Sequence, residues 1–369
     1  MNENYHIGID LGSQNIKIIL INLKENTTPK ILVKAIYPSS GISFGYITNK
    51  KEINSALKNA TDNFYEKYKI EIKEAFVSID GFGLKSENIT IIQSMSNRVI
   101  NSFDLEKIEE KSKTLLKKKT SDEIIHSEII NYSIDGFEHF DNPEGLSAKK
   151  LETDLFFLTC PKNILKTLEE IFENNNILVN AYIPAFLSLS ELAVQKIDKK
   201  LGTLVIDYGA EKTSLLLIEK NKPINYSVLK IGSKRITEKI TLEEKISFSE
   251  AESIKKANIK NSKITKIINS ELTLLAKEVN KILKKWDKSG ILPGGVTLVG
   301  NGSKITNIEE IFKKELNLPV KKPINKDLLD FFISYGNVIL GKKEKNKEKS
   351  IFSLKKIKPL FKIFNTFKL

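Results

Sequence analysis

The sequence predicts a mixed α/β protein with two related lobes and an amphipathic helix at the C-terminus. Three observations support this prediction. A strand–turn–strand pattern at residues 8–22 returns at residues 205–219. Segments with strand and helix periodicity alternate along most of the chain. Residues 341–350 contain no apolar side chain and separate an apolar, lysine-rich end from the rest.

The composition is that of a globular protein. The 369 residues are 40% hydrophobic and 28% charged, and their number is enough for two large domains or one split domain with insertions. Cys160 is the only cysteine, so no disulfide can form within the chain. The start, MNENYHIGIDLG, does not resemble a signal peptide, and no stretch has the roughly 18–20 apolar residues of a transmembrane span. We therefore expect a protein of the reducing cytoplasm.

The positive charge is concentrated at the C-terminus. The net charge is +13, but residues 341–369 contain ten Lys and two Glu, so they contribute +8 and the other 340 residues only +5. Arg98 and Arg235 are the only arginines among the 59 basic residues. Since arginine is the usual reader of bases and phosphates, we expect no nucleic-acid partner.

Periodicity places the elements in two successive series. In the first series we expect strands at 6–11, 16–23, 76–79, 89–92, 124–134 and 155–159, and helices at 54–68, 105–118, 164–174 and 184–196. In the second series we expect strands at 201–207, 214–219 and 296–299, and helices at 249–257, 264–286 and 308–316.

The repeated motif indicates an internal duplication. GIDLGSQNIKIILIN and VIDYGAEKTSLLLIE each contain a strand that ends in Asp, then x-Gly, then a returning strand. One such motif is most simply an ordinary hairpin. Two copies about two hundred residues apart, with a third glycine turn in GGVTLVGNGS (294–303), are a much more specific set.

The paired turns have the chemistry of phosphate binding. Backbone N–H groups of such turns can surround phosphate oxygens, and glycine permits the close approach. Asp10 and Asp207 can hold Mg²⁺ through water, because this ion prefers a few carboxylates and retained waters. Ser13 and Lys17 lie just beyond the first turn, and Lys17 can reach a β- or γ-phosphate.

These motifs resemble those of the superfamily of actin, sugar kinases and heat-shock chaperones. GIDLGSQNIK and VIDYGAEKTS are similar to its two phosphate loops, GGVTLVGNGS to its adenosine motif, and SEAESIKK to its AE-x-x-K helix. The resemblance implies an actin-like two-lobed ATPase fold with ATP and Mg²⁺ in the cleft. It implies phosphate contacts by Gly12, Ser13, Lys17, Gly209 and Thr213, Mg²⁺ binding by Asp10 and Asp207, and nucleoside contacts by Glu252, Lys255, Gly300 and Gly302.

Within this superfamily the chain resembles the FtsA family. Residues 124–159 are similar to the FtsA-type inserted subdomain in their His, Y-x-I-D-G, N-P-x-G and Leu-Glu, in that order. The resemblance implies a scaffold that assembles with itself into actin-like filaments on the cytoplasmic face of the membrane at the division site. It also implies that the small subdomain of the second lobe binds the C-terminal peptide of FtsZ.

The second loop departs from the FtsA pattern. Where that family usually has D-x-G-G-G-T-T-D, this chain has Asp207-Tyr-Gly-Ala-Glu-Lys-Thr-Ser214. Glu211 places a carboxylate near the expected phosphates, which predicts weaker triphosphate binding unless Lys212 or Mg²⁺ offsets it. Ile183 and Pro184 stand where hydrolysing relatives have a Gln or Glu, and neither can position water. We expect at most a slow ATPase.

Two alternatives stay open. The second loop also resembles that of PilM, the type IV pilus adaptor, which normally needs no amphipathic tail of its own. A phosphotransferase of the sugar-kinase type is the other alternative, and it requires a catalytic carboxylate that the Ile183–Pro184 position does not supply.

The last residues have the pattern of an interfacial helix. Leu354, Ile357, Phe361, Phe364 and Phe367 fall on one helical face, together with Leu360, and Lys355, Lys358 and Lys362 fall opposite. This pattern predicts binding to an anionic membrane surface, although Pro359 should kink or restart the helix. Packing of this helix on the protein's own core is the alternative.

The resemblance implies the following domain boundaries. The first lobe comprises 1–79 and 161–200, with the inserted FtsA-type subdomain at 80–160. The second lobe comprises 201–232 and 291–340, with its small subdomain at 233–290. A charged linker at 341–350 then leads to the membrane-binding amphipathic helix at 351–369.

Overall fold

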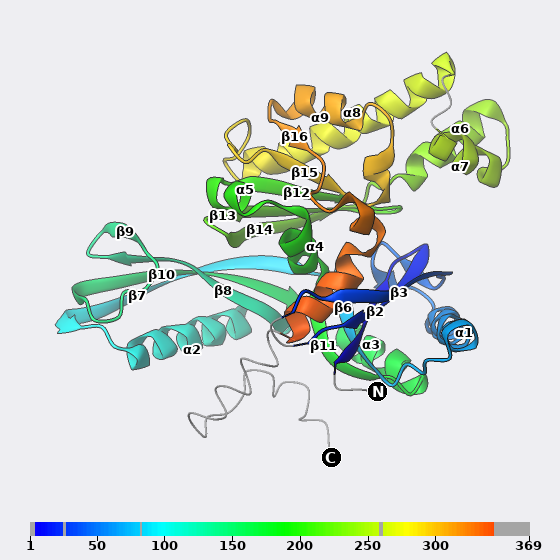
Figure 1. Ribbon diagram of the computed structural model, residues 1–369. Coiled ribbons are helices and arrows are strands. Elements are labelled where there is room, and N and C mark those ends of the chain that lie inside the picture. The colour runs from blue at the N-terminus through cyan, green and yellow to red at the C-terminus, as the bar shows by residue number, and fades with distance from the viewer. Residues whose placement is uncertain (1–3, 25–26, 82, 258–260, 343–369) are drawn as a thin grey trace.

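Two five-stranded sheets with the same strand order organise the protein (Figure 1). The structure is a computed structural model that describes residues 4–24, 27–81, 83–257 and 261–342. The first sheet has the order β11-β6-β1-β2-β3, formed by Leu178–Pro184, Glu74–Ile79, Tyr5–Leu11, Asn15–Asn22 and Lys30–Pro38. The second has the order β14-β13-β12-β15-β16, formed by Lys222–Leu229, Thr213–Glu219, Thr203–Tyr208, Val296–Val299 and Val320–Lys321.

The pairing within the two sheets confirms the duplication. In the first sheet β1, β2 and β3 form an antiparallel meander, and β6 and β11 join β1 in parallel on the other side. In the second sheet β12, β13 and β14 form the meander, and β15 and β16 join in parallel. The carboxyl ends of β1, β6, β12 and β15 therefore occupy corresponding positions in the two sheets.

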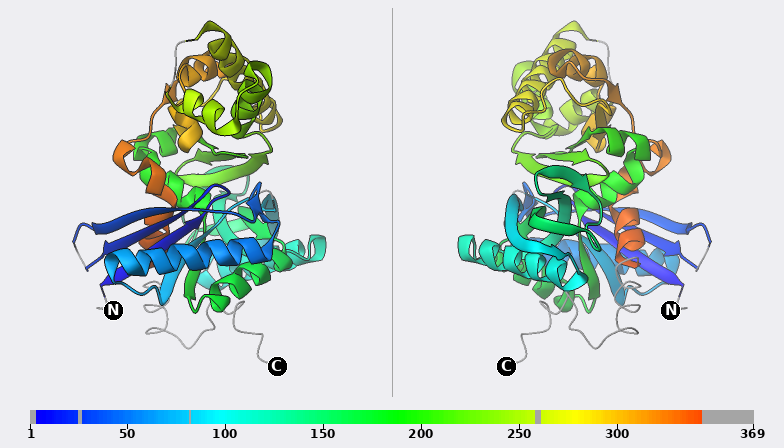
Figure 2. Two further views of the ribbon diagram at one scale, coloured as in Figure 1. Left: turned by 90° about the vertical axis from the view of Figure 1, so that its right-hand side faces the viewer. Right: turned by 90° about the vertical axis from the view of Figure 1, so that its left-hand side faces the viewer.

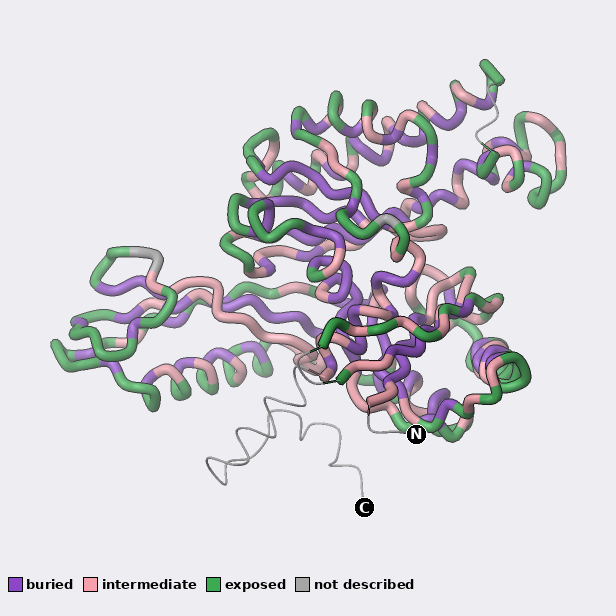
Figure 3. Tube along the Cα trace, viewed as in Figure 1, coloured by how far each residue is buried: buried purple, intermediate pink, exposed green. Residues whose placement is uncertain are grey.

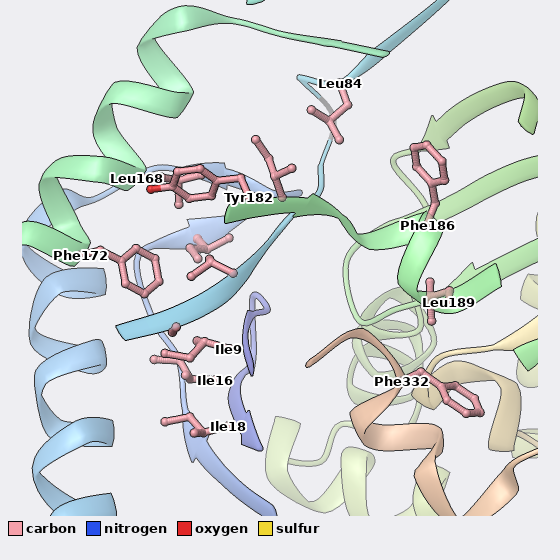
Figure 4. Close-up of a cluster of buried hydrophobic side chains, with 14 of the residues drawn as sticks. Ile9, Ile16, Ile18, Leu84, Leu168, Phe172, Tyr182, Phe186, Leu189 and Phe332 are labelled. Carbon is pink, nitrogen blue, oxygen red and sulfur yellow. The ribbon is translucent and has the colours of Figure 1, made fainter. Parts of the chain in front are cut away.

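Helices α1 (Lys50–Tyr68) and α3 (Lys162–Asn174) form the outer layer of the first lobe, away from the second lobe (Figures 1 and 2). Asn49 is the N-cap of helix α1. Its side chain accepts hydrogen bonds from two backbone N–H groups of the first turn, which a helix otherwise leaves without partners. The buried residues of α1 follow helical spacing: Ile53, Leu57, Ala60 and Phe64. Figure 4 shows the core that these elements share, with Phe172 of α3 near the side chains of β1 and β2.

The second lobe has its own core. Helices α8 (Ser262–Lys285) and α9 (Ile308–Leu316) lie against the second sheet on the side away from the first lobe (Figure 1). Helices α6 (Lys234–Glu244) and α7 (Phe248–Ala257) pair beside them and make a smaller unit at the edge of the lobe. The turn η1 (Asn301–Lys304) follows β15 directly.

The residues between β6 and α3 form a separate four-stranded sheet of order β7-β10-β8-β9. Its strands are β7 (Lys85–Val99), β10 (Ser147–Cys160), β8 (Glu123–Ile134) and β9 (Phe137–Phe140), and α2 (Ser102–Lys119) covers one face (Figure 1, left). β7 and β10 are much longer than the expected 89–92 and 155–159, because polar residues on their exposed face interrupt the apolar pattern. An apolar cluster of its own makes this insert a distinct unit.

The insert also contacts the second lobe. The Ser86 hydroxyl donates to the Tyr226 carbonyl over 2.9 Å, and the Lys222 ammonium donates to the Ile130 carbonyl over 3.2 Å. Both contacts join a strand of the insert to β14. The insert therefore connects the two lobes on one side of the molecule.

Two helical segments pass between the lobes. The expected helix at 184–196 is two helices, α4 (Ala185–Ala193) and α5 (Lys196–Leu201), because Val194 is extended and buried between them. The segment 332–342 is also helical and crosses α4. A Cβ on Gly336 would lie 2.5 Å from that of Ser188, so only glycine permits this crossing. Asn337 Nδ2 donates to the Ile9 carbonyl over 3.1 Å and ties the segment to β1.

The buried residues follow the sheets and the inner faces of these helices (Figure 3). The remaining described elements are short: β4 (Ile42–Ser43), β5 (Tyr46–Ile47) and η2 (Lys326–Phe331). No helix in the described part of the chain is long and apolar enough to span a bilayer. The C-terminal helix expected at 351–369 lies outside the described residues.

Replacing Phe156 by Ala should destabilise the protein by about 3–5 kcal/mol, because the ring is fully buried where β10 enters the core of the first lobe. Phe137→Ala, in the same insert, is the matched control. Its ring is 74% exposed, so we expect a change within about 0.5 kcal/mol. Urea unfolding measures both. Equal losses for the two variants would contradict the buried position of Phe156.

Cys160 should resist alkylation in the folded protein. Its side chain is fully buried, and burial raises the pKa of the thiol to about 12. The reactive thiolate is therefore scarce at pH 8 as well as inaccessible. We expect iodoacetamide to label the protein in urea but not in buffer, as mass spectrometry can show. Rapid labelling of folded protein would contradict this arrangement.

Candidate functional site between the lobes

Asp10 lies near the end of β1 and is almost fully buried, with 6% of its surface exposed. Its Oδ1 accepts from the Ser78 hydroxyl over 2.9 Å, and its Oδ2 lies 3.6 Å from the Lys17 ammonium. Lys17 is on β2, directly opposite Asp10 in the antiparallel pair. The expected carboxylate and lysine of the first turn are thus side by side.

Asp207 holds the corresponding position in β12 of the second lobe. Burial is the main cause that raises the pKa of its carboxyl group to about 6. Four neighbouring charges also act on this pKa: Lys212 and Lys17 lower it, and Asp80 and Asp10 raise it. Residues from both lobes are therefore close enough to influence one another electrostatically.

The resulting cluster has three carboxylates, Asp10, Asp80 and Asp207, and two ammonium groups, Lys17 and Lys212. Its surplus negative charge, beside a carboxylate whose pKa is raised by burial, fits a divalent cation. No three ionisable ligand side chains in the described residues are gathered closely enough to hold an ion unaided. Mg²⁺ takes one or two carboxylates and completes its shell with water and phosphate oxygens, so Asp10 and Asp207 are the residues that could hold it.

The turn after β1 and the turn after β12 are each closed by the same kind of backbone hydrogen bond. The Gly12 amide donates to the Asn15 carbonyl over 3.0 Å, and the Gly209 amide donates to the Lys212 carbonyl over 3.0 Å. Ser13 lies half-buried within the first turn. The turns resemble each other in conformation as well as in sequence, but these two glycine amides already have partners.

The second turn is held by residues on both sides of the cleft. Thr213 is fully buried, and its hydroxyl donates to the Ile231 carbonyl over 2.5 Å. Glu211 Oε2 accepts from the Phe44 amide over 3.0 Å, and Oε1 lies 3.2 Å from the Lys234 ammonium. The carboxylate of Glu211 is thus neutralised by Lys234, which reduces the repulsion of phosphates that the sequence alone suggests.

Asp80 was missed in the sequence analysis. It follows β6 and accepts from the Tyr226 hydroxyl over 2.8 Å and from the Gly81 amide over 2.8 Å, and it pairs with Lys212. The signal was available in SIDGFG (78–83), a further Asp-Gly at the end of an expected strand. Because β6 corresponds to β15 in the duplicated fold, the pairing of Ile9 with Val77 and of Ile206 with Leu298 makes Asp80 the counterpart of Asn301.

Gly300 and Gly302 form the third turn and pack against the second one. Gly300 has a φ of +79°, and a Cβ there would lie 2.3 Å from Asp207 Oδ1. A Cβ on Gly302 would lie 2.3 Å from the Tyr208 ring. Glycine is required at both positions because β15 and β12 bring these residues into direct contact.

Glu252 and Lys255 lie on α7 and bind each other. Lys255 is buried, and its ammonium lies 2.7 Å from Glu252 Oε2, 2.8 Å from the Thr237 hydroxyl and 3.1 Å from the Ser233 carbonyl. Burial is the main cause that lowers the pKa of Lys255. This pair is connected to the second turn through Ser233, whose amide donates to the Gly209 carbonyl over 3.0 Å.

Ile183 and Pro184 end β11, and the pairing of Pro184 with Ile79 places them beside the end of β6. Both are apolar and buried. They bring no proton-accepting side chain to this edge of the cleft.

Two family models match separate parts of the chain. "Cell division protein FtsA" matches residues 204–330, and "SHS2 domain inserted in FTSA" matches residues 81–159, which are the insert seen in the structure. The chain belongs to the FtsA family. FtsA proteins of Pseudomonas aeruginosa and Buchnera aphidicola subsp. Schizaphis graminum are 19% and 23% identical to it, over 85% and 88% of this chain and 82% and 86% of theirs.

Solved structures confirm the actin-like fold. A structure described as the PilM-PilN type IV pilus biogenesis complex has a TM-score of 0.69 at 16% identity, and covers 91% of this chain and 98% of its own. MreB5 of Spiroplasma citri, in a structure with ADP, has a TM-score of 0.54 at 14% identity and covers 95% and 99%. At these identities the similarity establishes the fold and leaves the choice of function to the family match.

Lys255→Met should destabilise the FtsA-family chain by about 2–4 kcal/mol, because it removes a buried ammonium and leaves Glu252 without its main partner. Lys256→Met is the matched control. That side chain is 72% exposed and also faces Glu252, so we expect a change within about 0.5 kcal/mol. Chemical unfolding without nucleotide measures both. If Lys255→Met leaves the free energy of unfolding unchanged, contact with the nucleoside is the role that remains for this lysine.

Proposed function

We propose that this protein is an ATP-binding, actin-like scaffold that assembles on the cytoplasmic face of the membrane at the division site and tethers FtsZ filaments there. The observation that carries the proposal is the match of both the second lobe and the insert to FtsA-specific family models. The insert is important because the model it matches is that of a domain inserted in FtsA.

The charges between the lobes support binding of ATP with Mg²⁺. Asp10 and Asp207 would hold the ion, and Lys17 would neutralise phosphate charge. The turns at Gly12, Ser13, Gly209 and Thr213 would surround the phosphates, and Gly300 and Gly302 would face the nucleoside together with the α7 pair Glu252 and Lys255. MreB5 structures with ADP and with AMPPNP support nucleotide binding by this fold.

Not every predicted ligand would contribute by direct contact. The Thr213 hydroxyl and the Lys255 ammonium already have partners within the protein. These two residues would fix the shape of the second turn and of the α6–α7 unit. With Ile183 and Pro184 at the end of β11, we expect hydrolysis to be slow at most.

Arg235 and Lys239 of α6 are the cations that would meet the acidic C-terminal peptide of FtsZ. Arg235 Nε and Lys239 Nζ lie 2.7 and 2.6 Å from the two oxygens of Glu271, a side chain that is 4% exposed. Two cations share one carboxylate, and each is 42% exposed. One positive charge is therefore left over at the surface to attract a carboxylate of the peptide.

The tail would provide the membrane contact. Leu354, Ile357, Phe361, Phe364 and Phe367 would enter the acyl boundary, and the lysines opposite them would face anionic headgroups. Self-assembly would then form actin-like filaments on the membrane, with the insert making the contact along the filament.

Lys17→Met should weaken MgATP binding about tenfold, since one charge-assisted phosphate contact is lost. Lys30→Met, an exposed lysine on β3, should leave the affinity unchanged. Titration with a fluorescent ATP analogue gives both values. Equal affinities for the two variants would exclude Lys17 from the phosphate site.

Electron microscopy of the full chain on anionic vesicles with MgATP tests the scaffold itself. We expect filaments on the vesicles, and loss of vesicle binding when residues 351–369 are removed. Dispersed particles under all conditions would contradict assembly. Unchanged vesicle binding after truncation would contradict the membrane role of the tail and favour a PilM-like adaptor.

A further inference from the structure

The cleft between the lobes is bridged by the protein's own side chains. Asp80, at the end of β6 in the first lobe, receives two donors from the second lobe. One is the Lys212 ammonium on the turn between β12 and β13, and the other is the Tyr226 hydroxyl on β14, 2.8 Å away. Burial and the neighbouring Asp80 raise the pKa of Tyr226, so its hydroxyl stays protonated and remains a donor.

A second bridge lies next to the first. Glu211 precedes Lys212 on the same turn and accepts from the Phe44 amide over 3.0 Å. Phe44 is at the tip of the short β4–β5 hairpin of the first lobe and has a φ of +51°. The hairpin rests on Asp80 and Gly81, because a Cβ on Gly45 would lie 2.2 Å from the Gly81 Cα. The turn between β12 and β13 of the second lobe therefore contacts two adjoining parts of the first lobe, the end of β6 and the β4–β5 hairpin.

We infer that Asp80, Lys212, Tyr226, Glu211 and the Phe44 amide form an interlobe clasp that holds the cleft closed without nucleotide. In a two-lobed protein of this kind, a ligand between the lobes can supply the contacts that favour closure. Here Glu211 and Lys212, two of the four residues that depart from the glycine-rich FtsA loop, supply such contacts themselves.

The strength of the clasp comes from its shielding. The side chains of Asp80 and Lys212 are 19% and 17% exposed, so their attraction is screened by water less than that of a surface pair. The contacts of the insert with β14, such as the bond from the Lys222 ammonium to the Ile130 carbonyl, join the lobes elsewhere. Loss of the clasp should therefore open the cleft without separating the lobes.

Distance measurement between spin labels in nucleotide-free full chain tests this inference. Asn59→Cys on α1 and Lys284→Cys on α8 place one label on each lobe at exposed positions, and the buried Cys160 can stay. We expect a single narrow distance that MgATP changes little. Lys212→Met and Asp80→Asn should each give a longer and broader distribution, and the double variant should open no further than either single one.

Lys288→Met is the matched control. Lys288 pairs with Glu219 over 2.5 Å with similar exposure, 27% and 30%, but both residues belong to the second lobe. The distance distribution of the labelled Lys288→Met variant should equal that of the labelled protein without this substitution. Glu211→Ala is a second, independent variant that should also open the cleft.

The clasp is refuted if the nucleotide-free protein is already as open as Lys212→Met and closes only with MgATP. Opening by Lys288→Met to the same extent would also overturn it, since general destabilisation would then explain the change. The inference goes beyond the proposed function. Because its decisive comparison contains no nucleotide, it can fail or succeed whether or not the protein binds ATP.

Discussion

Carboxylates from both lobes, Asp10, Asp80 and Asp207, lie near one another between the lobes, and neighbouring lysines compensate for their repulsion. Asp10 is paired with Lys17 within the first lobe, whereas Asp80 is paired with Lys212 across the cleft. For Asp207, burial is the main cause that raises the pKa of the carboxyl group to about 6, although Lys212 and Lys17 lower it. The duplication produces this convergence, because corresponding strands in both sheets end at the same cleft.

The apolar framework keeps that polar centre in place. The core of the first lobe continues through Phe186 of α4 to Tyr226 of β14, so apolar side chains of both lobes pack together beside the polar centre. Asn337 and Gly336 fasten the segment 332–342 to β1 and α4. The polar centre is therefore bordered by apolar contacts that join the two lobes.

Much of the fold could be predicted because its signals are local. The two Asp-x-Gly motifs and the apolar periodicity locate β1, β2, β12 and β13, and β15 and α9 have the expected bounds. The strands β3, β11 and β14 could not be predicted in this way. β3 is an edge strand with Lys30, Lys34 and exposed Ile36 on one face, so its pattern is that of a surface segment. β14 contains Pro223, which is unusual in a strand.

The site was predicted less completely than the fold. Sequence motifs place Asp10, Lys17 and Asp207 in two hairpins, and the structure shows Lys17 beside Asp10. Their roles in binding Mg²⁺ and phosphate stay predictions. They could not show that Thr213 donates to Ile231, or that Lys255 is buried against Ser233 and Thr237, because those contacts depend on packing between segments. Asp80 could have been found by comparing the two halves, where Asp80-Gly81 corresponds to Asn301-Gly302.

Binding of a labelled FtsZ C-terminal peptide to the full chain, followed by fluorescence anisotropy, tests the central claim that this protein is a division tether. The account predicts saturable binding that weakens with salt, because exposed cations at Arg235 and Lys239 attract an acidic peptide. Absence of binding by folded protein, with MgATP present, would contradict the tether and leave the actin-like fold without that role.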